Sequence, residues 1–291
     1  MAARLFCCPQ PLPLPAGPMM LPVASFLWAG YKRHLSAPAQ TIEVEAVGSS
    51  VTQFQPGDEV FADIGQHGFG AFAEYVSVPQ DALTLKPANI TFEEAAAVPQ
   101  AAVVALQGLR DNGKIQPGQT VLINGASGGL GTYAVQIAKS FGAEVTGVCS
   151  TRNVELVRAI GADHVIDYTH EDFTQHQQRY DLIFDIVANR SISDYMRALR
   201  PGGHYVACAF NPTALFLGPL LSFNGRKQAS SLIHKPNRDD LAIMQELLEA
   251  RKGVPVIDMC FPLREVADAM RYLAAGQHRG KVVITVAHKR V

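Results

Sequence analysis

The chain has 291 residues, a length that predicts about two domains. Hydrophobic residues make up 48% of it and charged residues 18%, a balance that excludes intrinsic disorder of the whole chain. Basic and acidic residues number 25 and 26, which argues against a nucleic-acid partner held by summed attraction to phosphates. No apolar run reaches the roughly 18 residues that span a bilayer, so we expect a soluble protein with no membrane partner.

The cysteines are few, scattered and odd in number. They predict neither a disulfide framework nor a zinc lobe, because no two of them form a C-x-x-C pair. We therefore expect a reducing, cytoplasmic location. The five positions are Cys7, Cys8, Cys149, Cys208 and Cys260.

Residues 1–40 form an atypical, Pro-rich N-terminal segment without acidic residues; the first acid in the chain is Glu43. Prolines at alternate positions from Pro9 to Pro15 forbid a helix and remove backbone donors, so we expect an extended or disordered stretch. Pro22 interrupts the apolar core of the segment, which makes a secretory signal a poor fit. A loosely ordered tail is the simpler interpretation, and an organelle presequence stays open as the alternative.

From Thr41 to Leu85 the sequence predicts a small β module. Ile42–Val47 alternates apolar and polar residues, as a half-buried strand does. Pro56–Asp58 is typical of a turn, and further strands are expected over Glu59–Phe61 and Ala71–Pro79.

A helix is predicted after this module and is interpreted as the hinge between two domains. Thr91 and Glu94 have the spacing of a capping box. The Ala-rich run that follows extends to Leu109, and Pro99 predicts a kink or break within it.

From Thr120 onward, strand-like and helix-like stretches alternate. Such alternation, with strands that are nearly all apolar, predicts a parallel sheet wrapped by crossover helices. The expected strands are Thr120–Asn124, Glu144–Cys149, His164–Tyr168, Asp181–Val187, His204–Ala209 and Lys281–Val286. The expected helices are Thr132–Phe141, Asn153–Ile160, Asp239–Ala250 and Leu263–Ala275.

A glycine-rich loop follows the first of these strands and opens a helix. Gly125, Gly128 and Gly131 form G-x-x-G-x-x-G, with Gly129 beside the middle glycine. Missing Cβ atoms let such a backbone turn tightly and approach a pyrophosphate, whose charge is met by the amides at the helix N-terminus. The strand before and the helix after make dinucleotide binding the favoured function, because glycine spacing alone is a weak signal.

The end of the second strand indicates which dinucleotide binds. An acidic residue there would bind the ribose hydroxyls of NAD, but Cys149–Asn153 contains no carboxylate. Arg152 can form charge-assisted bonds to a 2′-phosphate and Ser150 can donate another, which favours NADPH. The alternative is that Ser150 only caps a helix and Arg152 is a solvated surface residue.

Three other kinds of site fit less well. A zinc dehydrogenase needs Cys and His ligands in the first domain, where His67 stands alone, so no metal site is predicted. A short-chain reductase needs a Tyr followed four residues later by Lys, and no tyrosine here has it. A G-x-S-x-G hydrolase elbow is one residue out of register in Gly125–Gly129. Metal-free hydride transfer remains.

These stretches resemble the zinc-free, quinone oxidoreductase (zeta-crystallin-like) branch of the medium-chain dehydrogenase/reductase superfamily. The similarity covers residues 43 to 286 in order and spacing. Besides the glycine loop, it is carried by Val47-Gly48, Gln55–Val60, Gly70–Tyr75, Leu85–Pro87, Gln116–Gly118, Gly161–Asp163, Ile166–Tyr168 and Arg279–Val283.

The resemblance implies an α/β fold in which a Rossmann doubly wound parallel sheet accompanies a partial GroES-like β domain. The β domain would span residues 41–105, joined by the returning segment 255–291. The NADPH-binding domain would span residues 106–254. The resemblance also implies a homodimer.

The resemblance further implies positions for the cofactor contacts. Ser127, Gly128, Gly129 and Leu130 would contact the pyrophosphate, and Tyr168 would lie near the adenosine. Val187 and Phe210 would border the nicotinamide, and Lys281 would reach the cofactor from the returning C-terminal segment. No residue stands out as a catalytic general acid.

The N-terminal segment departs from the family pattern. The family's first strands carry an Asn-Pro stretch, whereas the first asparagine here is Asn89, so residues 1–40 replace those strands and leave sheet edges unpaired. The expected activity is hydride transfer from NADPH to a quinone or an α,β-unsaturated carbonyl. The alternative is an NADPH-binding protein with impaired or no catalysis.

Overall fold

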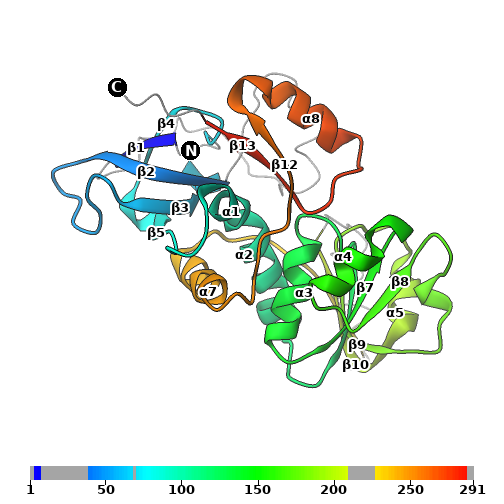
Figure 1. Cartoon of the computed structure of the whole chain (residues 1–291). Coiled ribbons are helices and arrows are strands. Elements are labelled where there is room, and N and C mark those ends of the chain that lie inside the picture. The colour runs from blue at the N-terminus through cyan, green and yellow to red at the C-terminus, as the bar shows by residue number, and fades with distance from the viewer. Residues whose placement is uncertain (1–2, 8–38, 68–69, 209–226, 287–291) are drawn as a thin grey trace, which may run out of the picture. The chain divides into compact units, whose positions relative to one another are not determined.

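The structure is a computed structural model that describes residues 3–7, 39–67, 70–208 and 227–286 (Figure 1). The chain divides into two compact units. Unit 1 contains the described residues up to Val103 and those from Lys235 onward, and unit 2 contains those of Val104–His234. Among the described residues, no helix is both long enough and apolar enough to cross a bilayer.

Unit 1 is built on a five-stranded sheet in the order β4-β1-β2-β3-β5. β2 pairs antiparallel with β3, and β3 pairs antiparallel with β5, so the chain forms a meander on this side. The inward face of these strands supplies a core that includes Ile42, Val44, Val60 and Leu83. The strands are β1 (Ala3–Cys7), β2 (Ala39–Val47), β3 (Glu59–Asp63), β4 (Tyr75–Val78) and β5 (Leu83–Leu85).

Strand β1 differs from the expectation for the N-terminal segment. Ala3–Cys7 lies between β2 and β4 and pairs in parallel with both (Figure 1). The prolines that forbid regular structure begin only at Pro9, so the short stretch before them is free to extend and donate hydrogen bonds. The edges of β2 and β4, expected to be unpaired, are therefore covered by this strand.

The capping box and the break at Pro99 are both confirmed. The Thr91 Oγ1 atom accepts from Glu94 N at 3.2 Å, and Glu94 Oε2 accepts from Thr91 N at 2.8 Å. Helix α1 (Phe92–Ala97) ends before Pro99, which begins α2 (Pro99–Gln107). A π-helical turn over Gly108–Asn112 follows, already within unit 2.

The C-terminal part of the chain belongs to unit 1, and it begins earlier than the sequence indicates. Helix α7 (Arg238–Glu249) is expected with the nucleotide-binding domain, yet it packs beside β5, and Asn89 Nδ2 donates to Leu248 O at 3.3 Å. Strand β12 (Ile257–Pro262), helix α8 (Val266–Ala274) and strand β13 (Lys281–Thr285) follow. β12 and β13 form a parallel pair.

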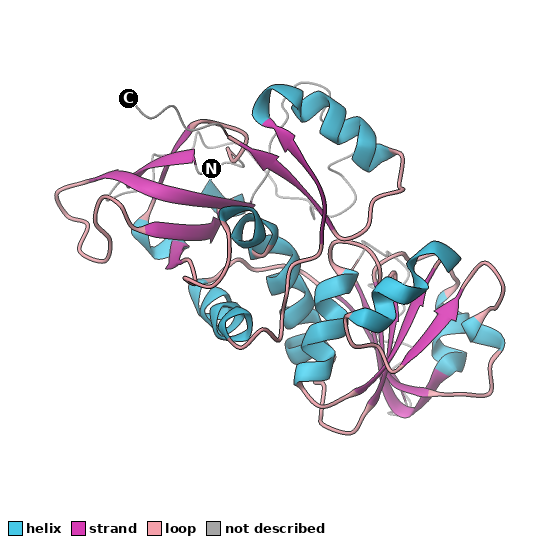
Figure 2. Ribbon diagram, in the orientation of Figure 1, coloured by secondary structure: helices cyan, strands magenta, loops and turns pink. Residues whose placement is uncertain are grey.

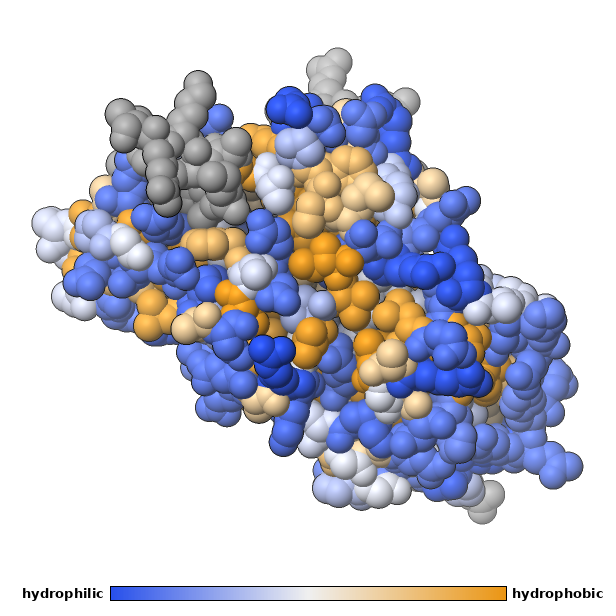
Figure 3. Space-filling model, viewed as in Figure 1, coloured by the Kyte–Doolittle hydropathy of each residue, from blue (hydrophilic) through white to orange (hydrophobic). Residues whose placement is uncertain are grey.

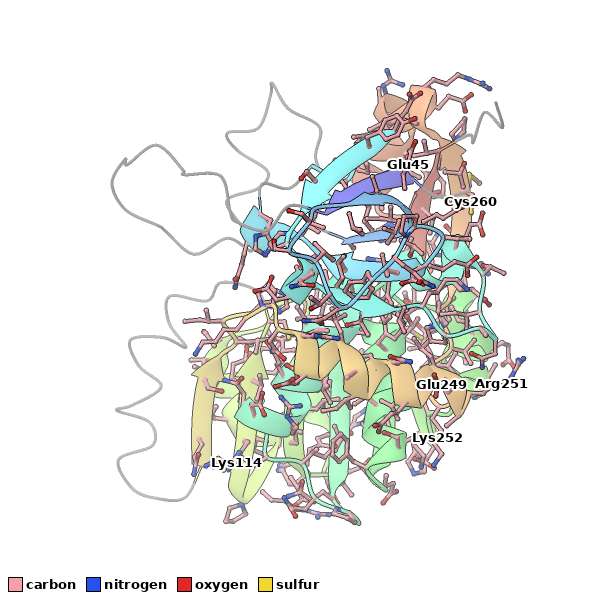
Figure 4. All side chains as sticks on the ribbon, turned by 90° about the vertical axis from the view of Figure 1, so that its left-hand side faces the viewer. Glu45, Lys114, Glu249, Arg251, Lys252 and Cys260 are labelled. Atoms are coloured by element: carbon pink, nitrogen blue, oxygen red, sulfur yellow. The ribbon has the colours of Figure 1, made fainter. Side chains whose placement is uncertain are left out.

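Helix α7 ends in a Schellman motif whose left-handed position is filled by Arg251. Lys252 N donates to Leu247 O at 2.8 Å and Arg251 N to Leu248 O at 3.0 Å. Arg251 and Lys252 lie just beyond α7 (Figure 4), and Arg251 has a φ of 54°. A Cβ atom is strained in this conformation, which glycine adopts freely.

We therefore expect Arg251→Gly to raise the free energy of unfolding by about 1 kcal/mol. Urea denaturation followed by circular dichroism measures the change. Arg251→Ala keeps the Cβ atom and serves as the control, which should give no gain. An equal gain from alanine would mean that the arginine side chain, and not its backbone conformation, carries the cost.

Unit 2 contains the predicted doubly wound α/β architecture. Its sheet has six parallel strands in the order β11-β10-β9-β6-β7-β8. The strands are β6 (Thr120–Asn124), β7 (Glu144–Cys149), β8 (His164–Asp167), β9 (Tyr180–Asp185), β10 (Leu199–Ala207) and β11 (Lys227–Ser231). The helices are α3 (Gly131–Ser140), α4 (Val154–Ala159) and α5 (Ile192–Ala198).

Helices pack on both faces of this sheet (Figure 2). On the face of α4, Gly147 permits close packing, because a Cβ atom there would lie 2.5 Å from the Val157 side chain. On the face of α5, Leu122, Ile183 and Tyr205 belong to one buried cluster with Tyr195 of the helix. The rings of Tyr195 and Tyr205 stack with their centroids 4.7 Å apart.

Candidate functional site

The order of the strands in unit 2 creates a switch point at β6. From β6 the chain builds outward through β7 and β8, then returns to place β9 on the other side of β6. Crossover connections diverge at such a point, and ligands of open α/β sheets bind there, beyond the carboxyl ends of the strands. Asn124 and Asp185 are the last residues of the two strands that flank it.

The glycine loop lies at this switch point, between β6 and α3. Gly125 has a φ of 92°, and a Cβ atom on Gly131 would lie 2.0 Å from Gly125 O. The fold therefore requires these two glycines. Gly128 is different, since the nearest atom to an added Cβ is Gly125 O at 3.6 Å. Its open side leaves room for a ligand, and Leu130 at the start of α3 makes no side-chain capping bond to the helix.

This contrast predicts different outcomes for two alanine substitutions. Gly131→Ala should destabilise unit 2 by several kcal/mol through steric overlap with the backbone. Gly128→Ala should leave unfolding nearly unchanged but weaken binding of a dinucleotide at least tenfold, because the new methyl group fills the space beside the loop. Thermal unfolding and fluorescence titration with NADPH measure the two effects. Unchanged affinity in Gly128→Ala would argue against a phosphate at this glycine.

Asn153 joins the glycine loop to the end of β7. Its Nδ2 atom donates to Ser127 Oγ at 3.0 Å and to Ser150 Oγ at 3.2 Å, which brings two predicted site residues together. Asn153 is 4% exposed, and its Oδ1 atom has no hydrogen-bond partner in the described part of the chain. No signal in the sequence predicted this link through Asn153, and the Ser150 side chain, expected alternatively as a helix cap, makes no capping bond.

The segment after β7 leaves Arg152 available to a ligand. Arg152 lies exposed in a 3-10 turn over Thr151–Asn153 and forms no salt bridge with any described residue. Strand β8, which pairs with β7, ends in an acid, Asp167. Partial burial raises the pKa of its carboxyl, but hydrogen bonds from Thr151 and Thr169 outweigh this and lower that pKa. Asp167 is thus a carboxylate already engaged by donors.

Tyr168 and Val187 lie at the same edge of the sheet. Tyr168 N donates to Cys149 O at 3.0 Å, which fixes Tyr168 beside the end of β7. A Cβ atom on Gly125 would lie 2.7 Å from Val187 Cγ2, so Val187 packs on the glycine loop. Both side chains are about half exposed, 53% for Tyr168 and 50% for Val187, and so are accessible to a ligand.

The structure does not test two of the predicted cofactor contacts. Phe210 lies outside the described residues. Lys281 belongs to β13 of unit 1 and lines a cavity there. A contact between Lys281 and a cofactor therefore stays a prediction.

A buried carboxylate, Asp185, organises the end of β9. Its Oδ1 atom accepts from Asn124 Nδ2 at 2.9 Å, from Val187 N at 3.2 Å and from Ala188 N at 3.0 Å. Its Oδ2 atom accepts from the Tyr205 hydroxyl at 2.8 Å. Asp185 is fully buried and well supplied with donors, so its role is to position the loop that carries Val187.

The loop held by Asp185 is strained, and two titratable groups of the sheet edge, Tyr195 near Asp185 and Cys149 at the end of β7, stay protonated. Ala188 has a φ of 54°, a left-handed conformation that alanine disfavours. Burial and the nearby Asp185 raise the pKa of the Tyr195 phenol, so it remains a hydrogen-bond donor. Burial, with a contribution from Asp167, raises the pKa of the Cys149 thiol to about 11, which leaves it a poor nucleophile at neutral pH.

Two family models match the chain. Residues 42–88 match the alcohol dehydrogenase GroES-like domain, and residues 160–284 match the zinc-binding dehydrogenase model. Within the described residues, no three His, Cys, Asp or Glu side chains gather closely enough to hold a metal ion. Among solved structures, the quinone oxidoreductase from Coxiella burnetii is similar with a TM-score of 0.76 and 29% identity, over 86% of this chain and 78% of that one.

Curated relatives point to the same family. The chain is 36% identical to the 2-methylene-furan-3-one reductase of Solanum lycopersicum and 35% identical to the NADPH-dependent alkenal/one oxidoreductase, chloroplastic, of Arabidopsis thaliana. Each match covers 83% of this chain but only 61% of the relative's length. The chloroplast envelope quinone oxidoreductase homolog of Arabidopsis thaliana is 31% identical, over 83% of this chain and 77% of its own. The chain therefore belongs to the medium-chain dehydrogenase/reductase superfamily, in its quinone oxidoreductase and alkenal/one oxidoreductase branch.

Proposed function

We propose that the protein is an NADPH-dependent oxidoreductase that transfers hydride to a quinone or to an α,β-unsaturated carbonyl compound, without zinc. The observation that carries the proposal is that the Ser150 hydroxyl and the Arg152 cation both follow β7, beside the glycine loop. Arg152 forms no salt bridge with any described residue. An acidic residue at this strand end would repel a 2′-phosphate, and none is present.

The residues at the edge of the sheet fit a dinucleotide. Ser127, Gly128, Gly129 and Leu130 would hold the pyrophosphate, since the space beside Gly128 and the first turn of α3 favour an anion. Asn153 keeps Ser127 and Ser150 together and offers its Oδ1 atom to a hydroxyl donor. Tyr168 would border the adenosine, and Val187 the nicotinamide, with Lys281 and Phe210 as the further expected contacts.

A bound nicotinamide nucleotide supplies the hydride. The chain's own task is to bind and orient the nucleotide and the acceptor and to exclude water. Quinones and enones are electrophilic, and holding the acceptor in place provides much of the rate. Asp185 serves this purpose by fixing Val187 through two backbone bonds. No side chain is assigned as a proton donor, since solvent can supply the proton.

The test is oxidation of NADPH, followed at 340 nm, with a panel of quinones, enones and saturated aldehydes. We expect turnover with quinones or enones, unaffected by a zinc chelator, and none with saturated aldehydes. Light scattering during the same preparation tests the expected homodimer. Turnover that a chelator abolishes would overturn the zinc-independent chemistry.

A second function is favoured by the departure at the N-terminus. Residues 1–40 lack the family's Asn-Pro stretch, and Ala3–Cys7 from this segment takes a place in the small sheet. A protein that binds NADPH without turnover would fit these features. Tight NADPH binding together with an empty substrate panel would select this function.

Location in the cytoplasm is also proposed, because the cysteines are scattered in sequence and three of them, Cys149, Cys208 and Cys260, are free thiols in the described part of the chain. Some relatives carry chloroplastic or mitochondrial in their names. Fractionation of cells that express a C-terminally tagged chain separates these compartments, and recovery in an organelle fraction would overturn the proposal.

A further inference from the structure

Unit 1 contains a cavity of about 260 Å³ between β2, α1, α8 and β13. Its lining is mostly apolar, and the side chains of Phe92, Ala96, Ala269 and Leu273 supply much of the wall. Figure 3 shows apolar side chains gathered over α8 with hydrophilic residues around them. A dry cavity of about 150 Å³ holds a benzene molecule, so this one has room for a ring and a short chain.

Two polar residues of the cavity lining, neighbours in β2, each have one side-chain atom without a hydrogen-bond partner among the described residues. The Thr41 Oγ1 and Gln40 Oε1 atoms are both unpartnered in the described part of the chain, and the two residues are only 6% and 5% exposed. The Gln40 Nε2 atom is already used, because it donates to Ala71 O at 2.9 Å. Buried polar atoms without partners are costly, so their presence indicates a ligand that supplies the missing bonds.

The cavity also contains a cation. Lys281 at the start of β13 lines it, forms no salt bridge with any described residue, and has its pKa lowered by burial. The other charged lining residue, Glu93, lies in the first turn of α1. Burial raises the pKa of Glu93, but a backbone hydrogen bond and the Thr91 hydroxyl are among the interactions that outweigh this and lower it, so that carboxylate already has partners. Lys281 is thus left for an anion.

We propose that this cavity binds a small monocarboxylate with an apolar, phenylpropanoid-sized body. The carboxylate would accept hydrogen bonds from Lys281 Nζ and from the Thr41 hydroxyl, while the body packs against Phe92 and Leu273. The lining of this site lies wholly within unit 1. Because Lys281 is also an expected cofactor contact, binding to the cavity has to be measured without nucleotide.

The test is calorimetric titration of the full chain, without nucleotide, using 3-phenylpropanoate and the matched neutral probe 3-phenylpropanamide. The acid should bind at least tenfold more tightly than the amide. Lys281→Met should remove that preference, Lys281→Arg should keep most of it, and Thr41→Val should weaken binding of the acid several-fold. Lys252→Met is the control for loss of one lysine at a site that does not line the cavity (Figure 4), and it should leave the preference intact.

Three results would overturn the proposal: no saturable binding of the acid, equal affinity for acid and amide, or a preference that survives in Lys281→Met. Near-ultraviolet circular dichroism verifies that each variant is folded, and Lys281→Arg keeps the charge if methionine disturbs the strand. Arg152→Asp should leave acid binding unchanged, so failure of the NADPH assignment is distinguishable from failure of this site.

Discussion

Replacing Arg152 with Asp is expected to weaken NADPH binding at least 100-fold while leaving the affinity for NADH unchanged or improved. The substitution removes charge-assisted bonds to the 2′-phosphate, worth about 1.5–3 kcal/mol, and adds a repelling carboxylate. A 100-fold change corresponds to about 2.8 kcal/mol, near the upper end of that range, and the added repulsion extends the loss further. Fluorescence titration with both nucleotides measures the ratio of dissociation constants.

Arg158→Asp is the matched control for this prediction. Arg158 is an exposed arginine in α4, and its Nη1 atom lies 2.8 Å from Glu155 Oε1. The substitution Arg158→Asp changes the net charge by the same amount as Arg152→Asp, only a few residues away in sequence. It should alter the ratio less than threefold. If both variants lose the same fraction of NADPH affinity, the effect reflects net charge near the sheet edge, and Arg152 has no specific role.

Removing the Asp185 carboxylate is expected to cause the largest loss of stability. Asp185→Ala leaves the Tyr205 hydroxyl, the Asn124 amide and two backbone amides without their shared acceptor inside the sheet. Breaking a buried charged network from one side costs about 3–5 kcal/mol. Urea denaturation should show this loss, and the loop carrying Val187 should exchange its amide hydrogens faster.

Two milder variants separate the carboxylate from the space it fills. Asp185→Asn keeps the shape and one oxygen, so it should cost about half as much as alanine. Tyr205→Phe removes a single donor and should cost about 1 kcal/mol. An Asp185→Ala variant as stable as the native chain would show that water replaces the carboxylate. That result would contradict the role of Asp185 in positioning the loop.

Much of unit 2 is predictable from local pattern. Thr120–Asn124 and Glu144–Cys149 are strands with the expected bounds, since their apolar runs end where the glycine loop and Ser150 begin. Strand β9 ends at Asp185, two residues earlier than expected, because the following amides turn back to that carboxylate. Helix α5 was missed, although Ser191, whose side chain accepts from Asp194 N, is a capping signal at its start.

The candidate site also has one part that the local sequence predicts and one part that it does not. The glycine loop and the Ser150–Arg152 segment follow from residue types at fixed spacing. The group around Asp185 does not, because Asn124 is 61 residues from Asp185 and 71 from Tyr195 in sequence. Only the placement of β9 beside β6 brings these side chains together. One hint was available: Asp185 is an acid near the end of an otherwise apolar strand.

The place of β1 within its sheet has a practical consequence. Because β4 has no other strand neighbour among the described residues, trimming Ala3–Cys7 would detach a whole ribbon of the β module instead of shortening an edge. Backbone amides and carbonyls supply the ladder on both sides, so the pentapeptide can be swapped for another β-prone sequence, whereas a proline inserted within it would cut the ladder.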